Sequence, residues 1–136
     1  MDRSRVGAIV FESPDELAWL ESLLHPLVGE RVAEWRAGLP PEVPLAIVEV
    51  PLLFETGMES AFHVTVAVVA ADEARASRAG LRGTDLLAAR SERQLPQSEK
   101  AARADHVITN DRSLEELERQ VAALLELLVR QSQEAR

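Results

Sequence analysis

The sequence has 136 residues, a length that suits one domain with a single hydrophobic core. Apolar residues make up 46% of it and charged residues 28%, an ordinary globular composition that argues against a disordered or fibrous chain. The net charge of −8 disfavours general binding to nucleic acids or anionic membranes, because phosphate contacts need a positive surface.

The residue types that are absent or sparse narrow the chemistry further. The chain has no cysteine, which excludes disulfides, thiolate metal sites and cysteine nucleophiles. No apolar run reaches the roughly 18 residues that span a bilayer, and the first residues do not resemble a secretion signal. We therefore expect a soluble, cytoplasmic protein.

The first forty residues are expected to be helical. A helix is predicted over residues 3–11, and a second begins at Pro14, where Ser13 can cap it and Glu16 can close a capping box. Pro26 should break or kink this second helix, which would place His25 at a helix terminus. A further helix is then expected from Val28 to Trp35, followed by a loop over residues 38–41.

The central stretch is LAIVEVPLLFETG, residues 45–57. Its apolar start predicts a strand buried on both faces, which stops at Pro51 because proline cannot extend the ladder. Ligands of open α/β sheets bind beyond the carboxyl ends of the strands, where Glu49, Phe54 and Glu55 would be displayed. The alternative is a core strand that runs into an ordinary surface turn.

The second half of the chain alternates strands and helices. Strands are predicted over residues 63–69 and 105–110, and Ser113 opens a last helix whose apolar face should pack on the sheet. Between the strands, residues 72–103 read as helical, with seven basic residues against five acidic ones. This stretch suits either an arginine-bearing lid over a polyphosphate or a solvated helical face. The order of elements is α/β.

A few polar residues could bind a ligand, although each also has a structural explanation. His25 could contact a ligand or simply favour the helix dipole, and Asn110 could bond a base edge or start a turn. The three histidines lack metal-ligand spacing, so no metal site is expected on them. None of the six glycines precedes a lysine, so the sequence contains no P-loop.

Several segments, in order, resemble dephospho-coenzyme A kinases. These segments are Asp2-Arg3 with Val10-Phe11, then LLHP at 23–26, EVPLLFE at 49–55, Arg90 with Gln94, and ADHVITN at 104–110. The family phosphorylates the ribose 3′-hydroxyl of dephospho-CoA with ATP, and the resemblance extends from about Asp2 to Leu128. The most specific feature is the pairing of PLLFE after a strand with LLHP about twenty-five residues earlier.

The resemblance implies roles for individual residues. His25, Pro51, Leu52, Leu53, Phe54 and Glu55 would line the dephospho-CoA pocket. Arg90 would be a catalytic lid arginine on the ATP phosphates, and Asn110 would lie near the adenine. Within one domain, residues from about 12 to 44 would form a helical substrate-side region, and residues 72–104 would form a lid-like region. Arg78 and Arg82 receive no role, because the lid motif of the family differs at these positions. ATP with Mg²⁺ is implied, although the usual metal ligands are not in this chain.

The resemblance also implies an incomplete fold. The family has a P-loop NTPase-like three-layer parallel sheet, and its first strand, with the glycine-rich loop, lies between the strands expected at 45–50 and 64–69. That segment has no counterpart here, so we expect an N-terminally truncated chain or a mis-assigned start. Loss of the strand would expose sheet edges and favour self-association. The alternatives to an enzyme are a non-catalytic CoA-precursor-binding module and an α/β interaction domain.

Overall fold

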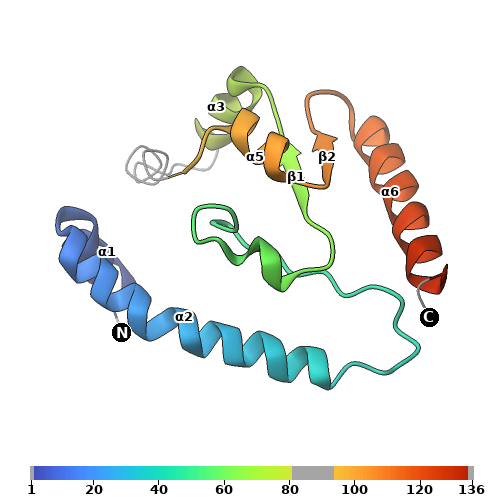
Figure 1. Cartoon of the computed structure of the whole chain (residues 1–136). Coiled ribbons are helices and arrows are strands. Elements are labelled where there is room, and N and C mark those ends of the chain that lie inside the picture. Colours follow the sequence, from blue (N-terminus) through green and yellow to red (C-terminus); the bar gives the residue numbers. More distant parts are fainter. Residues whose placement is uncertain (1, 81–93, 135–136) are drawn as a thin grey trace. The chain divides into compact units, whose positions relative to one another are not determined.

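The structure is a computed structural model that describes residues 2–80 and 94–134. Residues Met1–Ala46 form one compact unit and Ile47–Arg136 form a second. The first unit contains α1 (Arg3–Glu12) and α2 (Pro14–Ala37). The second contains η1 (Met58–Ala61), β1 (Val66–Val69), α3 (Asp72–Gly80), α5 (Gln97–Arg103), β2 (His106–Thr109) and α6 (Leu114–Glu134), labelled in Figure 1 where there is room.

The helix starts follow the capping chemistry of the sequence. The Ser13 side chain accepts a hydrogen bond from the Glu16 N–H at 3.4 Å, and Pro14 occupies the first helical position of α2. At α6, the Ser113 hydroxyl accepts from the Glu116 N–H at 3.3 Å. Both predicted starts are confirmed, because a cap needs only residues that are neighbours in sequence.

The predicted break at Pro26 is wrong. Helix α2 runs without interruption from Pro14 to Ala37 with Pro26 in its interior, so the separate helix expected from Val28 does not exist. Proline removes one backbone N–H and crowds the preceding turn, but established helical turns on both sides can absorb a local defect. His25 is therefore an exposed residue in the middle of a helix, not at its end.

The apolar residues of α2 are exposed. No residue of this helix is buried, and Trp19 keeps 60% of its surface accessible. Leucines recur at helical spacing along α2, but Leu23, Leu24 and Leu27 are all exposed. The first unit is thus a pair of helices, α1 packed on α2, with little buried surface.

The second unit is built on a two-stranded parallel sheet. β1 pairs with β2 in a register that places Val66 opposite His106 and Val69 opposite Thr109. Helix α5 contacts β1 and helix α6 contacts β2. Parallel strands joined through helices confirm the predicted α/β class.

Both strands are shorter than expected. Side chains take over the hydrogen bonding beside them: the Asp105 carboxylate bonds the Thr65 N–H and hydroxyl, each at 2.7 Å, before the strands begin. At the other end, the Gln97 side chain bonds the backbone of Ala70. The apolar core of the described residues consists of Phe54, Ala67 and Ile108.

The strand predicted at residues 45–50 is not formed. Residues 43–50 have neither helix nor strand assigned, the boundary between the two units falls after Ala46, and Ile47 is 71% exposed. Apolar, β-branched residues favour an extended chain locally, but a strand also needs a neighbouring backbone to bond. The expected burial on both faces is therefore wrong for the structure described.

Among the described residues, no helix combines the length and apolarity needed to cross a membrane.

Candidate functional site

The PLLFETG segment, Pro51–Gly57, folds as a short helical turn, here called the 51–57 turn. The Thr56 N–H donates to the Leu52 carbonyl at 3.1 Å, and the Met58 and Gly57 N–H groups donate to the Leu53 and Phe54 carbonyls at 3.0 and 3.4 Å. Gly57 has φ +68°, the left-handed conformation that ends such a turn in a Schellman motif. Proline at its start and glycine at its end therefore shape the segment locally.

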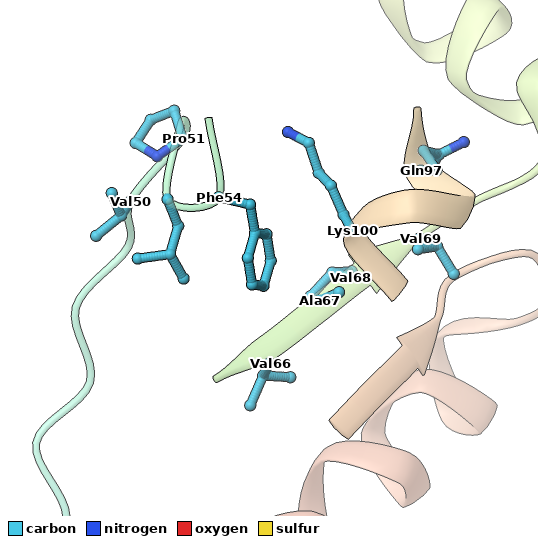
Figure 2. A pocket seen from close by; sticks show the side chains of 10 residues that line it. Val50, Pro51, Phe54, Val66, Ala67, Val68, Val69, Gln97 and Lys100 are labelled. Carbon is cyan, nitrogen blue, oxygen red and sulfur yellow. The ribbon is translucent and has the colours of Figure 1, made fainter. Parts of the chain in front are cut away.

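The 51–57 turn places one large side chain in the core. Phe54 is 6% exposed, whereas Pro51 is exposed and Leu52 and Leu53 are half-buried. Figure 2 shows the Phe54 ring between the turn and β1. Burial of this aromatic ring contributes to holding the turn against the sheet.

A small hollow lies between the 51–57 turn and β1. It has a volume of about 170 Å³ and is lined by Val50, Pro51, Leu53, Phe54, all four residues of β1, and Gln97 and Lys100 of α5 (Figure 2). We call it the β1 hollow. Drug-sized ligand sites usually exceed about 300 Å³, so this hollow could enclose only part of a nucleotide-sized ligand.

The two edges of β1 differ in their backbone hydrogen bonding. The carbonyls of Thr65 and Val69 accept from the N–H groups of His106 and Asn110 at 3.1 and 2.8 Å, which orients alternate residues toward β2. Val66 and Val68 therefore direct their backbone groups to the opposite edge. Val68 is also 62% exposed. Within the described part of the chain, β1 has a strand partner on one side only.

Helix α5 presents three polar side chains at three-residue spacing. Gln97 accepts from the Ala70 N–H at 2.9 Å and donates to the Ala70 carbonyl at 2.8 Å. Lys100 pairs with Glu55 at 2.7 Å. Arg103 pairs with Glu59 and lies 5.1 Å from the centre of the Phe54 ring. One face of α5 thus holds β1, the 51–57 turn and η1.

Glu55 is turned toward α5. Besides Lys100, its carboxylate accepts a hydrogen bond from the Leu95 N–H at 2.9 Å, and its side chain is 11% exposed. Burial alone would raise the pKa of the Glu55 carboxyl, but hydrogen bonds from Lys100 and from backbone N–H groups, with the positive charge of Lys100, lower it overall. Glu55 is consequently a charged, anchored carboxylate at neutral pH.

Two further carboxylates are held in their charged forms. Hydrogen bonds from the hydroxyl and N–H of Thr65 lower the pKa of Asp105. At Glu59 the pKa is lowered by its own backbone N–H and by Arg103. Both carboxylates tie segments of the second unit together. In the part of the chain that is described, no three histidine or carboxylate groups gather where they could together hold a metal ion.

The predicted site residues fall in different places. Pro51, Leu53 and Phe54 line the β1 hollow, while Leu52 uses its carbonyl within the turn. Asn110 follows β2, and its carbonyl accepts from the Arg78 guanidinium at 3.1 Å. His25 belongs to the other unit. Arg90 lies outside the described residues, as does the 81–93 part of the predicted lid-like region.

The sequence pattern assigned no site role to Gln97, Lys100 or Arg103. Their spacing of three residues on one short helix was visible, and Lys100 is the only lysine in the chain. Helical spacing alone, however, did not indicate which partners the three side chains would meet.

Comparison with known proteins places the chain in a family. The family model for CoaE, dephospho-CoA kinase, matches residues 1–116. A dephospho-CoA kinase of Thermus thermophilus is 40% identical over 129 residues, which cover 92% of this chain and 62% of that protein. A second, from Thermosynechococcus vestitus, is 41% identical over 96% of this chain and 64% of its own length.

A solved structure agrees with these relatives. The crystal structure of TT1252 from Thermus thermophilus superposes with a TM-score of 0.79 at 39% identity, over 93% of this chain and 67% of that one. The chain thus spans about three-fifths of the length of the two relatives named above. With a family model over most of its residues and relatives of this similarity, the chain belongs to the dephospho-CoA kinase family.

Proposed function

We propose that this chain binds dephospho-CoA and takes part in the ATP-dependent phosphorylation of its 3′-hydroxyl, the last step of coenzyme A biosynthesis. The observation that carries the proposal is the family match over residues 1–116, which includes every residue assigned to the site. Cytoplasmic location remains a prediction, which fractionation of cells expressing the chain would test.

The 51–57 turn supports a role in holding the acceptor substrate. It presents Pro51 and Leu53 beside the β1 hollow, and its shape is set by backbone hydrogen bonds within it. Phosphoryl transfer depends mainly on positioning the two substrates and neutralising charge. We propose that this turn contributes positioning, and that His25 and Leu52 also contact dephospho-CoA.

Charge neutralisation is assigned to residues beyond the described site. Arg90 remains our predicted catalytic arginine on the ATP phosphates, because guanidinium groups stabilise transferring phosphoryl oxygens. Asn110 is proposed to lie near the adenine. No step of the proposal is assigned to Mg²⁺.

Calorimetric titration with dephospho-CoA tests the binding proposal. We expect saturable binding, with weaker binding of CoA, which already carries a phosphate at the 3′ position. His25→Ala should weaken binding, whereas His63→Ala, a matched change at another exposed histidine, should not. Equal behaviour of the two variants would remove His25 from the site, and no binding by the unmodified chain would refute the proposal.

A transfer assay separates the enzyme from a non-catalytic binding module. The assay follows the γ-phosphate of labelled ATP to the 3′-hydroxyl in the presence of Mg²⁺. Transfer abolished by Arg90→Met and preserved in Arg130→Met would support catalysis. Binding of dephospho-CoA without transfer would favour the second candidate, a module that binds CoA precursors.

We also propose that the chain self-associates through the β1 edge, with a second copy as the partner. The support is the single strand neighbour of β1 in the described residues together with the exposed Val68, since such edges pair with other chains. Sedimentation velocity should show a dimer that Val68→Lys weakens. The corresponding change at the other strand, Val107→Lys, is the control. Monomeric behaviour at all concentrations would contradict the proposal.

A further inference from the structure

We infer that Lys100 is a positioning residue: through its ion pair with Glu55 it holds the 51–57 turn against β1. The inference rests on the proposed function in one respect, because it expects that moving the turn weakens dephospho-CoA binding. It also gives Glu55 a different task from direct contact with the substrate, because the carboxylate acts through α5.

The face of α5 explains how one short helix can set the place of the turn. Gln97 at its start is hydrogen-bonded to the backbone of Ala70 at the end of β1, which fixes the position of the helix on the sheet. Lys100, one turn later, reaches Glu55 in the 51–57 turn. Figure 2 shows the Lys100 side chain extending from α5 toward the turn. The turn is therefore located relative to β1 by way of α5.

The Glu55–Lys100 pair is largely buried, which makes the link between α5 and the 51–57 turn effective. The two side chains are 11% and 20% exposed, and their charged atoms are 2.7 Å apart. Removing one partner of a largely buried pair is costly because the remaining charge is left without compensation. Lys100 is the only cationic side chain that bonds Glu55 in the described residues.

The second carboxylate oxygen of Glu55 makes the place of this side chain depend more strongly on Lys100. Oε2 is buried and has no hydrogen-bond partner among the residues described, so Oε1 carries both the Lys100 and the Leu95 contacts. Without Lys100, the carboxylate would retain only backbone N–H donors. We expect it to turn toward water and to carry the neighbouring Leu53 and Phe54 away from the β1 hollow.

The test compares Lys100→Met, which removes the charge but keeps the length, with Lys100→Arg, which restores the charge. Glu99→Gln, on an exposed position of the same helix, is the matched control. The first readout is the methyl NMR spectrum of Leu52 and Leu53, which requires no ligand. The second is the affinity for dephospho-CoA measured by calorimetry.

We expect Lys100→Met to shift the Leu53 methyl signals and to weaken dephospho-CoA binding by about tenfold, the size typical of coupling between contacting residues. Lys100→Arg should recover most of both, and Glu99→Gln should match the unmodified chain. If Lys100→Met fails to fold, the double variant E55Q/K100M, which leaves no unpaired charge, should fold and still show shifted Leu53 methyls.

Unchanged Leu53 methyl signals in folded Lys100→Met or E55Q/K100M would overturn the inference, as would a Lys100→Arg variant no better than Lys100→Met. Shifted methyls with undiminished dephospho-CoA affinity would refute the consequence for binding. If the unmodified chain does not bind dephospho-CoA but the methyls still shift, the proposed function fails while the positioning role of Lys100 stands.

Discussion

Replacing Gln97 with leucine tests whether a side chain can take the place of a neighbouring strand at the end of β1. The carboxamide accepts from the Ala70 N–H at 2.9 Å and donates to the Ala70 carbonyl at 2.8 Å, the two bonds that a neighbouring backbone would make. Leucine keeps much of the volume and removes both bonds. The partly buried Ala70 groups would then lack their partners.

Each of these hydrogen bonds contributes about 0.5–1.5 kcal/mol net, so Gln97→Leu should lower the free energy of unfolding by about 1–3 kcal/mol. With a urea dependence of about 2 kcal/mol per M, the midpoint of unfolding falls by about 0.5–1.5 M. Hydrogen exchange of the Ala70 amide gives a residue-level measurement. This amide should lose protection while the amide of Ile108, in the core of β2, keeps most of its own.

The chain offers a matched control for this variant. Gln120 makes the same two contacts with the backbone of Thr109, each at 3.0 Å, but on the exposed side of β2. Water can replace these bonds, so Gln120→Leu should cost less than Gln97→Leu. Equal losses for the two variants, or undiminished protection of the Ala70 amide in Gln97→Leu, would refute the reasoning.

Three other predictions concern backbone conformation and pH. Gly57→Ala should destabilise the protein by about 1–2 kcal/mol because Gly57 has φ +68°. Gly29→Ala, inside α2 with open space around it, should stabilise the protein by about 0.5–1 kcal/mol. A thermal melt in which Gly57→Ala is the more stable variant would contradict both predictions. Pro26→Ala should stabilise the helix by up to about 3 kcal/mol and increase the helical circular dichroism signal. An unchanged stability would mean that Pro26 does not destabilise α2. Because the folded pKa of Glu55 lies below 4.5, its stabilisation is complete above that pH and is lost as the pH falls through the folded value. The stability difference between the unmodified chain and E55Q should therefore shrink in acid, and a constant difference down to pH 2 would argue against the Lys100 pairing.

Local chemistry explains what could be predicted along the chain. The starts of α2 and α6 follow from Ser13 and Ser113, whose hydroxyls reach backbone groups three residues away. The 51–57 turn likewise needs only its own carbonyls and the left-handed conformation of Gly57. Such contacts close over a few residues, and their cost in chain entropy is small and nearly independent of the rest of the fold.

Pro26 shows where a local rule misleads. The rule describes the hydrogen bond and the space that proline removes, and both losses are real. Whether the helix ends there depends on the turns that flank the proline, and α2 retains helical turns on both sides. For the same reason, the prediction that His25 lies at a helix terminus was wrong.

Residues 45–69 show most directly what residue order could and could not establish. Val66–Val69 and Leu45–Val48 have the same β-branched, apolar character, yet the first segment is a strand because His106–Thr109 lies beside it, and the second has no assigned strand. Likewise, the acidic and basic characters of Glu55 and Lys100 are evident from the sequence, but their pairing spans 45 positions and requires the folded arrangement of α5. Contacts between distant segments depend on which backbones the fold brings together, and no local propensity encodes that choice.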